Sequence, residues 1–173
     1  MKALISLILL LVMFVSTTLK SQQLTSPDSL LNRLTGKWIL NGVIDGQKTI
    51  HDIDVQRLLN GQYVQLKEVS REKDQKGNPL YEAIVYICWE DSKKQYSCLW
   101  LDNTSNRGIS NGIIGRAKQN GDKIEMLFKY GETSQFHTTF SYDKGTNSWQ
   151  WLMDGEENGK LQPFARVILT KNI

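Results

Sequence analysis

Turn signals recur so closely from Trp38 onward that no long helix fits between them. Most are Asn-Gly or Asp-Gly pairs or short clusters of Gly, Asn, Ser and Pro, which between apolar runs are strong signals for β-hairpins. They lie at 45–46, 60–61, 77–79, 92–94, 103–108, 120–121, 131, 144–145 and 158–159. Nine turns separate ten strands, so the chain is predicted to be all-β.

The segments between the turns alternate in polarity, as strands with one buried face do. Apolar side chains stand at every second position of 122–130, and the aromatic ones of 134–143 stand on the face opposite His137. The predicted strands span 37–44, 48–58, 62–73, 80–90, 95–102, 110–118, 122–130, 134–143, 147–154 and 161–171.

Short connections make successive strands antiparallel neighbours, and a meander of ten strands leaves two open edges unless the sheet closes. We therefore expect an antiparallel up-and-down barrel. A barrel of more than about eight strands encloses more space than its side chains easily fill, so a cavity for an apolar or amphipathic molecule follows. The residues predicted to line it are Trp38, Leu40, Phe128, Phe136, Phe140, Tyr142, Trp149 and Trp151.

A short helix is predicted just before the first strand. Ser26 is a good N-cap, Pro27 suits the first helical position, and the leucines at 30, 31 and 34 share one face. Gly36 can end this helix.

Residues 1–21 have the pattern of an export signal peptide. Lys2 supplies a positive start, residues 3–15 are almost wholly apolar, and small residues follow from Ser16. The apolar run is shorter than the roughly 20 residues that a membrane-spanning helix needs. Cleavage is expected between Thr18 and Gln22, which leaves residues 22–173 as a single barrel domain in the periplasm or outside the cell.

The net charge of the chain excludes one class of binding partner. Lys and Arg number 21 against 18 Asp and Glu, and the predicted signal peptide contains two of these basic residues and no acidic one. The remaining chain is nearly neutral and lacks the basic excess of a nucleic-acid-binding protein. No later apolar run is long enough for a membrane span, and nothing in the sequence sets an oligomeric state. With 2 Cys and 2 His, no metal site is predicted.

The two cysteines flank the turn at 92–94. A three-residue loop there pairs residues whose numbers sum to 186, which sets Cys88 opposite Cys98 within reach of a disulfide. Two reduced thiols are the alternative, and a loop of two or four residues would break this pairing. The register divides the hairpin into two faces. The more apolar face is predicted to point inward and has Val85, Ile87, Trp89, Ser97, Leu99 and Leu101. The other face has Ile84, Tyr86, Cys88, Glu90, Tyr96, Cys98, Trp100 and Asp102, which form an outer stripe or, if the facing is reversed, an amphipathic cavity wall.

The order of short helix, Gly36-Lys37-Trp38, strand meander and late Arg166 resembles the calycin superfamily, and within it the lipocalins. Lipocalins open their first strand with Gly-x-Trp, and a basic residue from a late strand packs over that Trp. The matching positions are Gly36, Trp38 and Arg166. The resemblance implies that these residues close one end of a lipocalin-like barrel, with a guanidinium stacked on the indole ring.

Residues 59–65, Leu-Asn-Gly-Gln-Tyr-Val-Gln, resemble a segment of a secreted bacterial lipocalin-like family, domain-of-unknown-function family 1579. Residues 93–96 and 100–103 resemble its later Lys-Lys-x-Tyr and Trp-x-Asp-Asn stretches. Cys88-Trp89-Glu90 departs from the usual Gly-Tyr-Asp of that family. The resemblance covers residues 30–171 and implies export and a barrel fold, and it brings no catalytic residues.

Few side chains offer catalytic or cofactor chemistry. Nitrobindin-like haem proteins share a ten-stranded barrel, and His51 and His137 are the candidates for an axial ligand. His137 is predicted to face solvent. His51, Asp52 and Asp54 offer metal-ligand types, but His51 and Asp52 are neighbours on a strand and face opposite ways. No nucleophile motif is found.

The sequence predicts an exported, non-catalytic, lipocalin-like barrel that binds or carries a small apolar or amphipathic molecule. The alternatives are a haem-binding barrel with redox or isomerase chemistry and an envelope interaction protein with a filled barrel.

Overall fold

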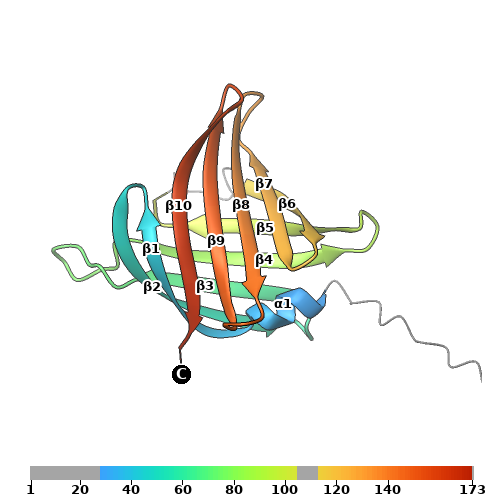
Figure 1. Ribbon diagram of the computed structural model, residues 1–173, viewed down its shortest axis with the longest axis horizontal. Helices are drawn as coiled ribbons and strands as arrows, with labels where there is room; N and C mark the ends of the chain where they lie inside the picture. Colours follow the sequence, from blue (N-terminus) through green and yellow to red (C-terminus); the bar gives the residue numbers. More distant parts are fainter. Residues whose placement is uncertain (1–27, 105–112, 173) are drawn as a thin grey trace, which may run out of the picture.

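The barrel is described by a computed structural model for residues 28–104 and 113–172. A short helix, α1 (Asp28–Leu34), precedes ten strands. The strands are β1 (Gly36–Ile44), β2 (Gln47–Leu58), β3 (Tyr63–Ser70), β4 (Glu82–Glu90), β5 (Gln95–Asp102), β6 (Ile113–Asn120), β7 (Lys123–Lys129), β8 (Ser134–Asp143), β9 (Ser148–Glu157) and β10 (Lys160–Lys171). Successive strands pair antiparallel and β10 pairs with β1, so the predicted up-and-down barrel is confirmed (Figure 1).

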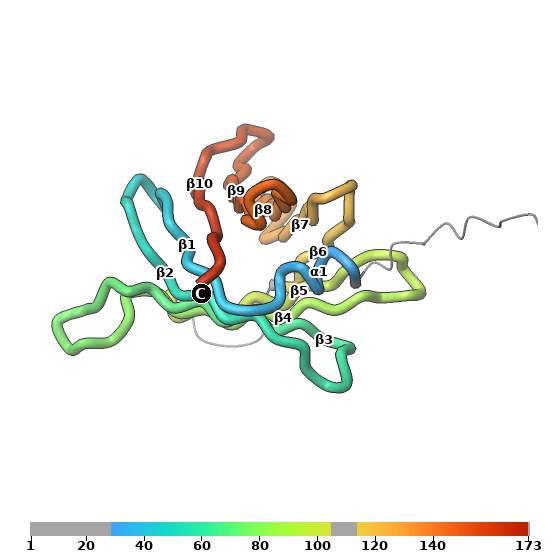
Figure 2. Tube along the Cα trace, turned by 60° about the horizontal axis from the view of Figure 1, so that its bottom comes forward, coloured from blue at the N-terminus to red at the C-terminus, as the bar shows by residue number. Residues whose placement is uncertain are grey.

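The barrel is flattened into two crossing layers. In Figure 1 the strands β8, β9 and β10 run steeply across β3, β4 and β5 behind them. The helix α1 and the C-terminal end of β10 lie at one end of the barrel, as both views show (Figures 1 and 2). The β1–β2 turn and the β9–β10 turn lie toward the opposite end.

Turn chemistry explains most strand boundaries. Asp45-Gly46 and Asn158-Gly159 have positive φ at both residues, as tight two-residue hairpin turns require. The strand predicted over 62–73 ends earlier, at Ser70, because residues 71–81 leave the sheet in a loop closed by a bridge between Lys73 and Pro79. The strand predicted over 147–154 extends to Glu157. The strand predicted over 110–118 spans Ile113–Asn120, and its first three predicted residues lie outside the described ones.

The predicted register of the β4–β5 hairpin is wrong by one residue. The connecting loop has four residues, with Lys94 in the left-handed conformation, so Cys88 pairs with Ser97 and Ile87 with Cys98. Because side chains alternate along a strand, this slip turns every side chain of β5 to the other face. Val85 and Ile87 lie inside as expected, but the inner residues of β5 are Tyr96, Cys98, Trp100 and Asp102, and Ser97, Leu99 and Leu101 lie on the outer face.

The disulfide alternative fails for the same reason. Cys98 is buried inside the barrel, whereas Cys88 lies on the outer face of β4, and both are free thiols. Burial raises the pKa of the Cys98 thiol, which keeps it protonated.

The end of the barrel near α1 is closed by packed side chains. Leu30, Leu31 and Leu34 of α1 are buried against the core, and Trp38 lies beneath them with no exposed surface. The basic group over the Trp38 ring is Lys171, whose Nζ lies 3.9 Å from the ring centroid and donates to the backbone oxygen of Thr35. Gly36, next to this contact, has a φ of 113°, a backbone conformation that residues with a side chain rarely adopt, so the position favours glycine.

The expected role of Arg166 at this end is therefore wrong. Arg166 pairs with Val43 near the other end of β1, and its guanidinium forms an ion pair with Asp154 on the outer surface. Its neighbours Ala165 and Val167 point inward, so strand alternation turns Arg166 outward.

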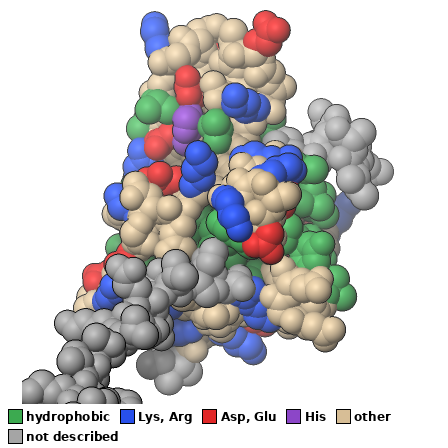
Figure 3. Space-filling view, turned by 90° about the vertical axis from the view of Figure 1, so that its right-hand side faces the viewer, with side chains coloured by type: hydrophobic (Ala, Val, Ile, Leu, Met, Phe, Trp, Pro, Cys, Tyr) green, Lys and Arg blue, Asp and Glu red, His purple; other side chains and the backbone are tan. Residues whose placement is uncertain are grey.

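The outer surface has mixed charge. On the face shown in Figure 3, Lys and Arg side chains are interspersed with acidic and uncharged ones. His137 lies on the outer face of β8 as predicted, where its Nε2 is 2.5 Å from Glu156 Oε2.

The predicted signal peptide, residues 1–21, lies outside the described residues. Among the residues that are described, none belongs to a helix long and apolar enough to cross a membrane.

Candidate functional site

A cavity of about 600 Å³ opens into the end of the barrel opposite α1. One side of it is polar and the other is aromatic and aliphatic. The described residues that line it are Ile44, Asp45, Gln47, Lys48, Thr49, His51, Glu68, Ser70, Glu72, Leu80, Tyr81, Trp100, Asp102, Thr104, Phe128, Tyr130, Phe136, Met153 and Phe164. A volume of this size is typical of a site for a small molecule.

A buried histidine–glutamate pair forms the polar side. His51 on β2 and Glu68 on β3 are only 3% and 1% exposed, and Nδ1 of the imidazole is 2.5 Å from Oε1 of the carboxyl group. Strand alternation places them there, because His51 shares its face with Ile53 and Val55, and Glu68 shares its face with Leu66. Two titratable groups therefore occupy positions that the strand pattern normally gives to apolar residues.

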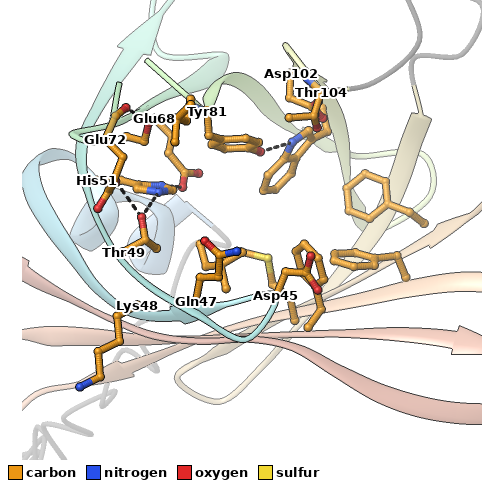
Figure 4. Close-up of a pocket in the computed structure, with 18 of the residues that line it drawn as sticks. Asp45, Gln47, Lys48, Thr49, His51, Glu68, Glu72, Tyr81, Asp102 and Thr104 are labelled. Atoms are coloured by element: carbon orange, nitrogen blue, oxygen red, sulfur yellow. Dashed lines mark hydrogen bonds and ion pairs between the residues drawn. The ribbon is translucent and has the colours of Figure 1, made fainter. Parts of the chain in front are cut away.

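A chain of hydrogen bonds joins this pair to the mouth of the cavity (Figure 4). The Thr49 hydroxyl lies 2.8 Å from His51 Nε2 and donates to Glu72 Oε2 at 2.9 Å. A hydroxyl has one proton, so His51 Nε2 must be the donor to Thr49. A single further proton is then shared between His51 Nδ1 and Glu68 Oε1.

The two carboxyl groups of this chain differ in acidity. Burial raises the pKa of Glu68 above its ordinary value of 4.5, although the hydrogen bond with His51 opposes the shift. Burial acts in the same direction on Glu72, but backbone hydrogen bonds and the Thr49 hydroxyl outweigh it and lower the pKa of Glu72. Glu72 is therefore an ionised acceptor at neutral pH.

Aromatic side chains continue the lining from the His51–Glu68 pair. Trp100 Nε1 donates to the Tyr81 hydroxyl at 3.2 Å, and the Tyr81 ring stacks against His51 with centroids 5.7 Å apart. Trp100 also meets Phe128 edge to face. Burial, followed by the charge of Glu68, raises the pKa of Tyr81, so its hydroxyl stays neutral.

A β-bulge contributes to the mouth of the cavity. The pairing of β10 with β9 shifts between Pro163 and Ala165, so Phe164 lies out of register. Its ring packs against Phe136 with centroids 5.5 Å apart, and both rings line the cavity. Bulges commonly redirect a side chain in this way.

The structure divides the aromatic residues predicted for the wall. Phe128 and Phe136 line the cavity. The others fill the half of the barrel nearer α1: Trp38, Leu40, Phe140, Trp149 and Trp151 are buried there, and half-buried Tyr142 packs against them beneath Arg33. The interior is thus packed at one end and open at the other, which differs from the filled barrel of the envelope-protein alternative.

Sequence reasoning missed Glu68, Thr49, Glu72, Tyr81 and Trp100 as site residues. The signal for Glu68 was its position two residues after Leu66, on the face that alternation assigns to the interior. The one-residue error in the β4–β5 register assigned Trp100 to the outer face, and only the reversed facing put it in the cavity wall. Tyr81 and Glu72 lie in the loop before β4, where no periodicity applies.

The fold and the cavity define a class of protein, a closed antiparallel ten-stranded barrel with a partly open interior. The solved structure of Rv2717c from M. tuberculosis has the same kind of fold, with a TM-score of 0.54 and 14% identity over 84% of this chain and 97% of that one. At this identity the likeness concerns the fold. No protein-family model and no curated protein matches the chain, so its resemblance to domain-of-unknown-function family 1579 stays a prediction.

Replacing Glu68 with glutamine is expected to change how stability depends on pH. A carboxyl group whose pKa is raised by folding binds more protons in the folded state, so the free energy of unfolding falls as pH rises above 4.5 through the raised pKa. Glu68→Gln removes this contribution, and the variant should gain stability relative to the wild type as pH increases.

Denaturant unfolding between pH 4 and 8 measures this difference. Charged and titratable neighbours of Glu68 are His51 on β2, Asp102 on β5 and Tyr81. The same series on Glu156→Gln controls for loss of a carboxylate outside the cavity. Parallel curves for Glu68→Gln and the wild type would contradict the raised pKa.

Proposed function

We propose that this chain is an exported barrel that binds a small amphipathic molecule in the cavity and catalyses no reaction. The observation that carries the proposal is the two-sided cavity itself, with aromatic rings on one side and the His51–Glu68 pair on the other. Apolar walls with a few fixed polar groups are what binding sites for small molecules use to combine affinity with orientation. The signal-like residues 1–21 and the resemblance to a secreted family support export.

The donor atoms do not fit the haem alternative. In this arrangement both ring nitrogens of His51 carry hydrogen bonds, one with Glu68 and one with Thr49. His137 lies on the outer face of β8, paired with Glu156. Neither described histidine presents an unpartnered nitrogen to the cavity, so a haem site is not proposed.

Binding can be tested with N-phenyl-1-naphthylamine, an uncharged dye whose fluorescence rises in apolar surroundings. We expect saturable binding of the dye to the wild type, with about one molecule in this cavity. Met153→Trp should abolish most of this signal, because Met153 is buried in the cavity wall and the larger side chain can occupy the open space.

The matched control is Ile168→Trp, which places the same side chain on the outer face of β10, where Ile168 is half exposed. This variant should bind the dye like the wild type. The proposed function fails if the wild type shows no saturable binding, or if Met153→Trp folds and binds the dye unchanged.

A further inference from the structure

Glu68 Oε2 is a buried oxygen without a hydrogen-bond partner in the described part of the chain. Its other oxygen shares one proton with His51 Nδ1, whichever of the two groups holds it. In both cases Oε2 bears no proton and can only accept a hydrogen bond. A buried acceptor left unpaired is unfavourable, so a ligand that donates to it gains more than the same contact in water would give.

The carboxyl group lies beside the open space. Figure 4 shows Glu68 next to the His51 ring at one side of the cavity, with Asp102 and Thr104 at the other. Glu68 lines the cavity although it is only 1% exposed, so a donor must come into close contact with its carboxyl group while the rest of the bound molecule lies in the cavity.

The charge around this acceptor is negative. The His51–Glu68 pair with its shared proton is neutral overall, but Asp45, Glu72 and Asp102 also line the cavity, against a single lysine or arginine among the described lining residues, Lys48. Lys48 lies on the outer face of β2, and Figure 4 shows its side chain directed away from the cavity. Such a lining opposes an anion and favours a cation.

The aromatic side suits a cation as well as an alkyl body. The Tyr81 ring stacks on His51 beside Glu68, Trp100 donates to the Tyr81 hydroxyl, and Phe128 adjoins Trp100. Aromatic faces attract ammonium groups and also bury methylene groups favourably. The lining is thus complementary to a molecule that has both an ammonium group and an alkyl body.

We propose that the cavity takes amphipathic amines, with a protonated N–H group donating to Glu68 Oε2 and the apolar body held by Trp100 and its aromatic neighbours. This inference rests on the proposed function and specifies its ligand class. Fatty acids and other amphipathic anions are the class that the site rejects.

Octylamine, octanol and octanoate at pH 7 provide the test, because they share one alkyl chain and differ in head group. Each competes for the wild-type cavity with N-phenyl-1-naphthylamine. We expect octylamine to bind at least about tenfold more tightly than octanol, the size of a charge-assisted hydrogen bond, and octanoate to bind most weakly.

Glu68→Gln identifies the group responsible. The amide is neutral and keeps a hydrogen-bonding group for His51, so octylamine affinity should fall about tenfold while octanol changes less than about threefold. Glu156→Gln is the matched control, since it makes the same change beside a histidine on the outer surface, and it should leave both affinities unchanged. Glu72→Gln, at the mouth, should lower octylamine affinity to a smaller extent and serves if Glu68→Gln does not fold.

The outcomes separate the two proposals. Dye binding without a preference for octylamine overturns the amine inference and leaves the proposed function standing. Preference for octanoate, or an equal loss in Glu68→Gln and Glu156→Gln, also overturns it. Absence of saturable dye binding overturns the proposed function itself.

Discussion

Replacing Trp38 with alanine is expected to lower the free energy of unfolding by about 3–5 kcal/mol, the cost of truncating a large buried aromatic residue. Trp38 is fully buried, and its indole N–H donates to the backbone oxygen of Leu34 at 2.6 Å. The ammonium group of Lys171 also lies over the face of its ring. One side chain therefore joins α1, the first strand and the last strand at the closed end of the barrel.

Trp38→Phe separates the contribution of the buried ring from that of the indole hydrogen bond. Phenylalanine keeps most of the apolar cover and loses the N–H, so it should cost about 1–2 kcal/mol, the value of a buried hydrogen bond. Denaturant unfolding measures both variants. Dye binding should survive in each under conditions where it is folded, because Trp38 lies at the end of the barrel opposite the cavity. A cost below about 1 kcal/mol for Trp38→Ala would show that this end is not held by Trp38.

Local patterns of the sequence predicted the strands of the barrel because apolar residues recur at every second position along them. In β7 and β8 the apolar and aromatic residues stand at every second position, and these are the residues found inside. Asp-Gly and Asn-Gly pairs then mark where the chain reverses. Neither signal depends on contacts between distant segments, so one chain is enough to detect both.

The site was harder to predict because polar residues on a strand are ordinarily assigned to solvent. His51 and Glu68 stand on the inner faces of β2 and β3, separated by sixteen residues of sequence, and only the pairing of those strands brings them together. Strand alternation assigns Glu68 to the same face as Leu66, although the sequence analysis did not use this signal. Treating that position as informative would have found the acidic side of the cavity.

The errors in the facing of β5 and in the basic residue over Trp38 arise from strand register, which a single sequence specifies weakly. One additional residue in the β4–β5 loop exchanged the faces of Leu101 and Trp100. The basic residue over Trp38 depends on how β10 pairs with β1, strands at opposite ends of the chain. That pairing sets Lys171 opposite Trp38 and Arg166 opposite Val43.

Replacing Trp151 with alanine is expected both to destabilise the barrel and to deepen the cavity. Trp151 stacks on Phe140 at 4.3 Å between ring centroids and lies 5.7 Å from Trp100, which lines the cavity. Its N–H donates to the buried Thr138 hydroxyl at 2.6 Å. Loss of this ring should cost about 3–5 kcal/mol and remove the partition between the open and the packed halves of the interior.

The deeper cavity should change how the affinity for an amine depends on the length of its alkyl chain. Each additional buried methylene contributes about 0.8 kcal/mol, or about fourfold in affinity, until the alkyl chain reaches the floor. Affinities of amines from hexyl to dodecyl should therefore stop rising at a longer chain in Trp151→Ala than in the wild type.

Trp149→Ala is the matched control for this result. Trp149 is equally buried but lies one inward position further from the cavity, where it packs on Tyr142. Its removal takes away a comparable ring without touching the floor, so the length at which affinity levels off should match the wild type. If Trp151→Ala and Trp149→Ala give the same length profile, Trp151 does not form the floor, and ligands must occupy the barrel only near its mouth.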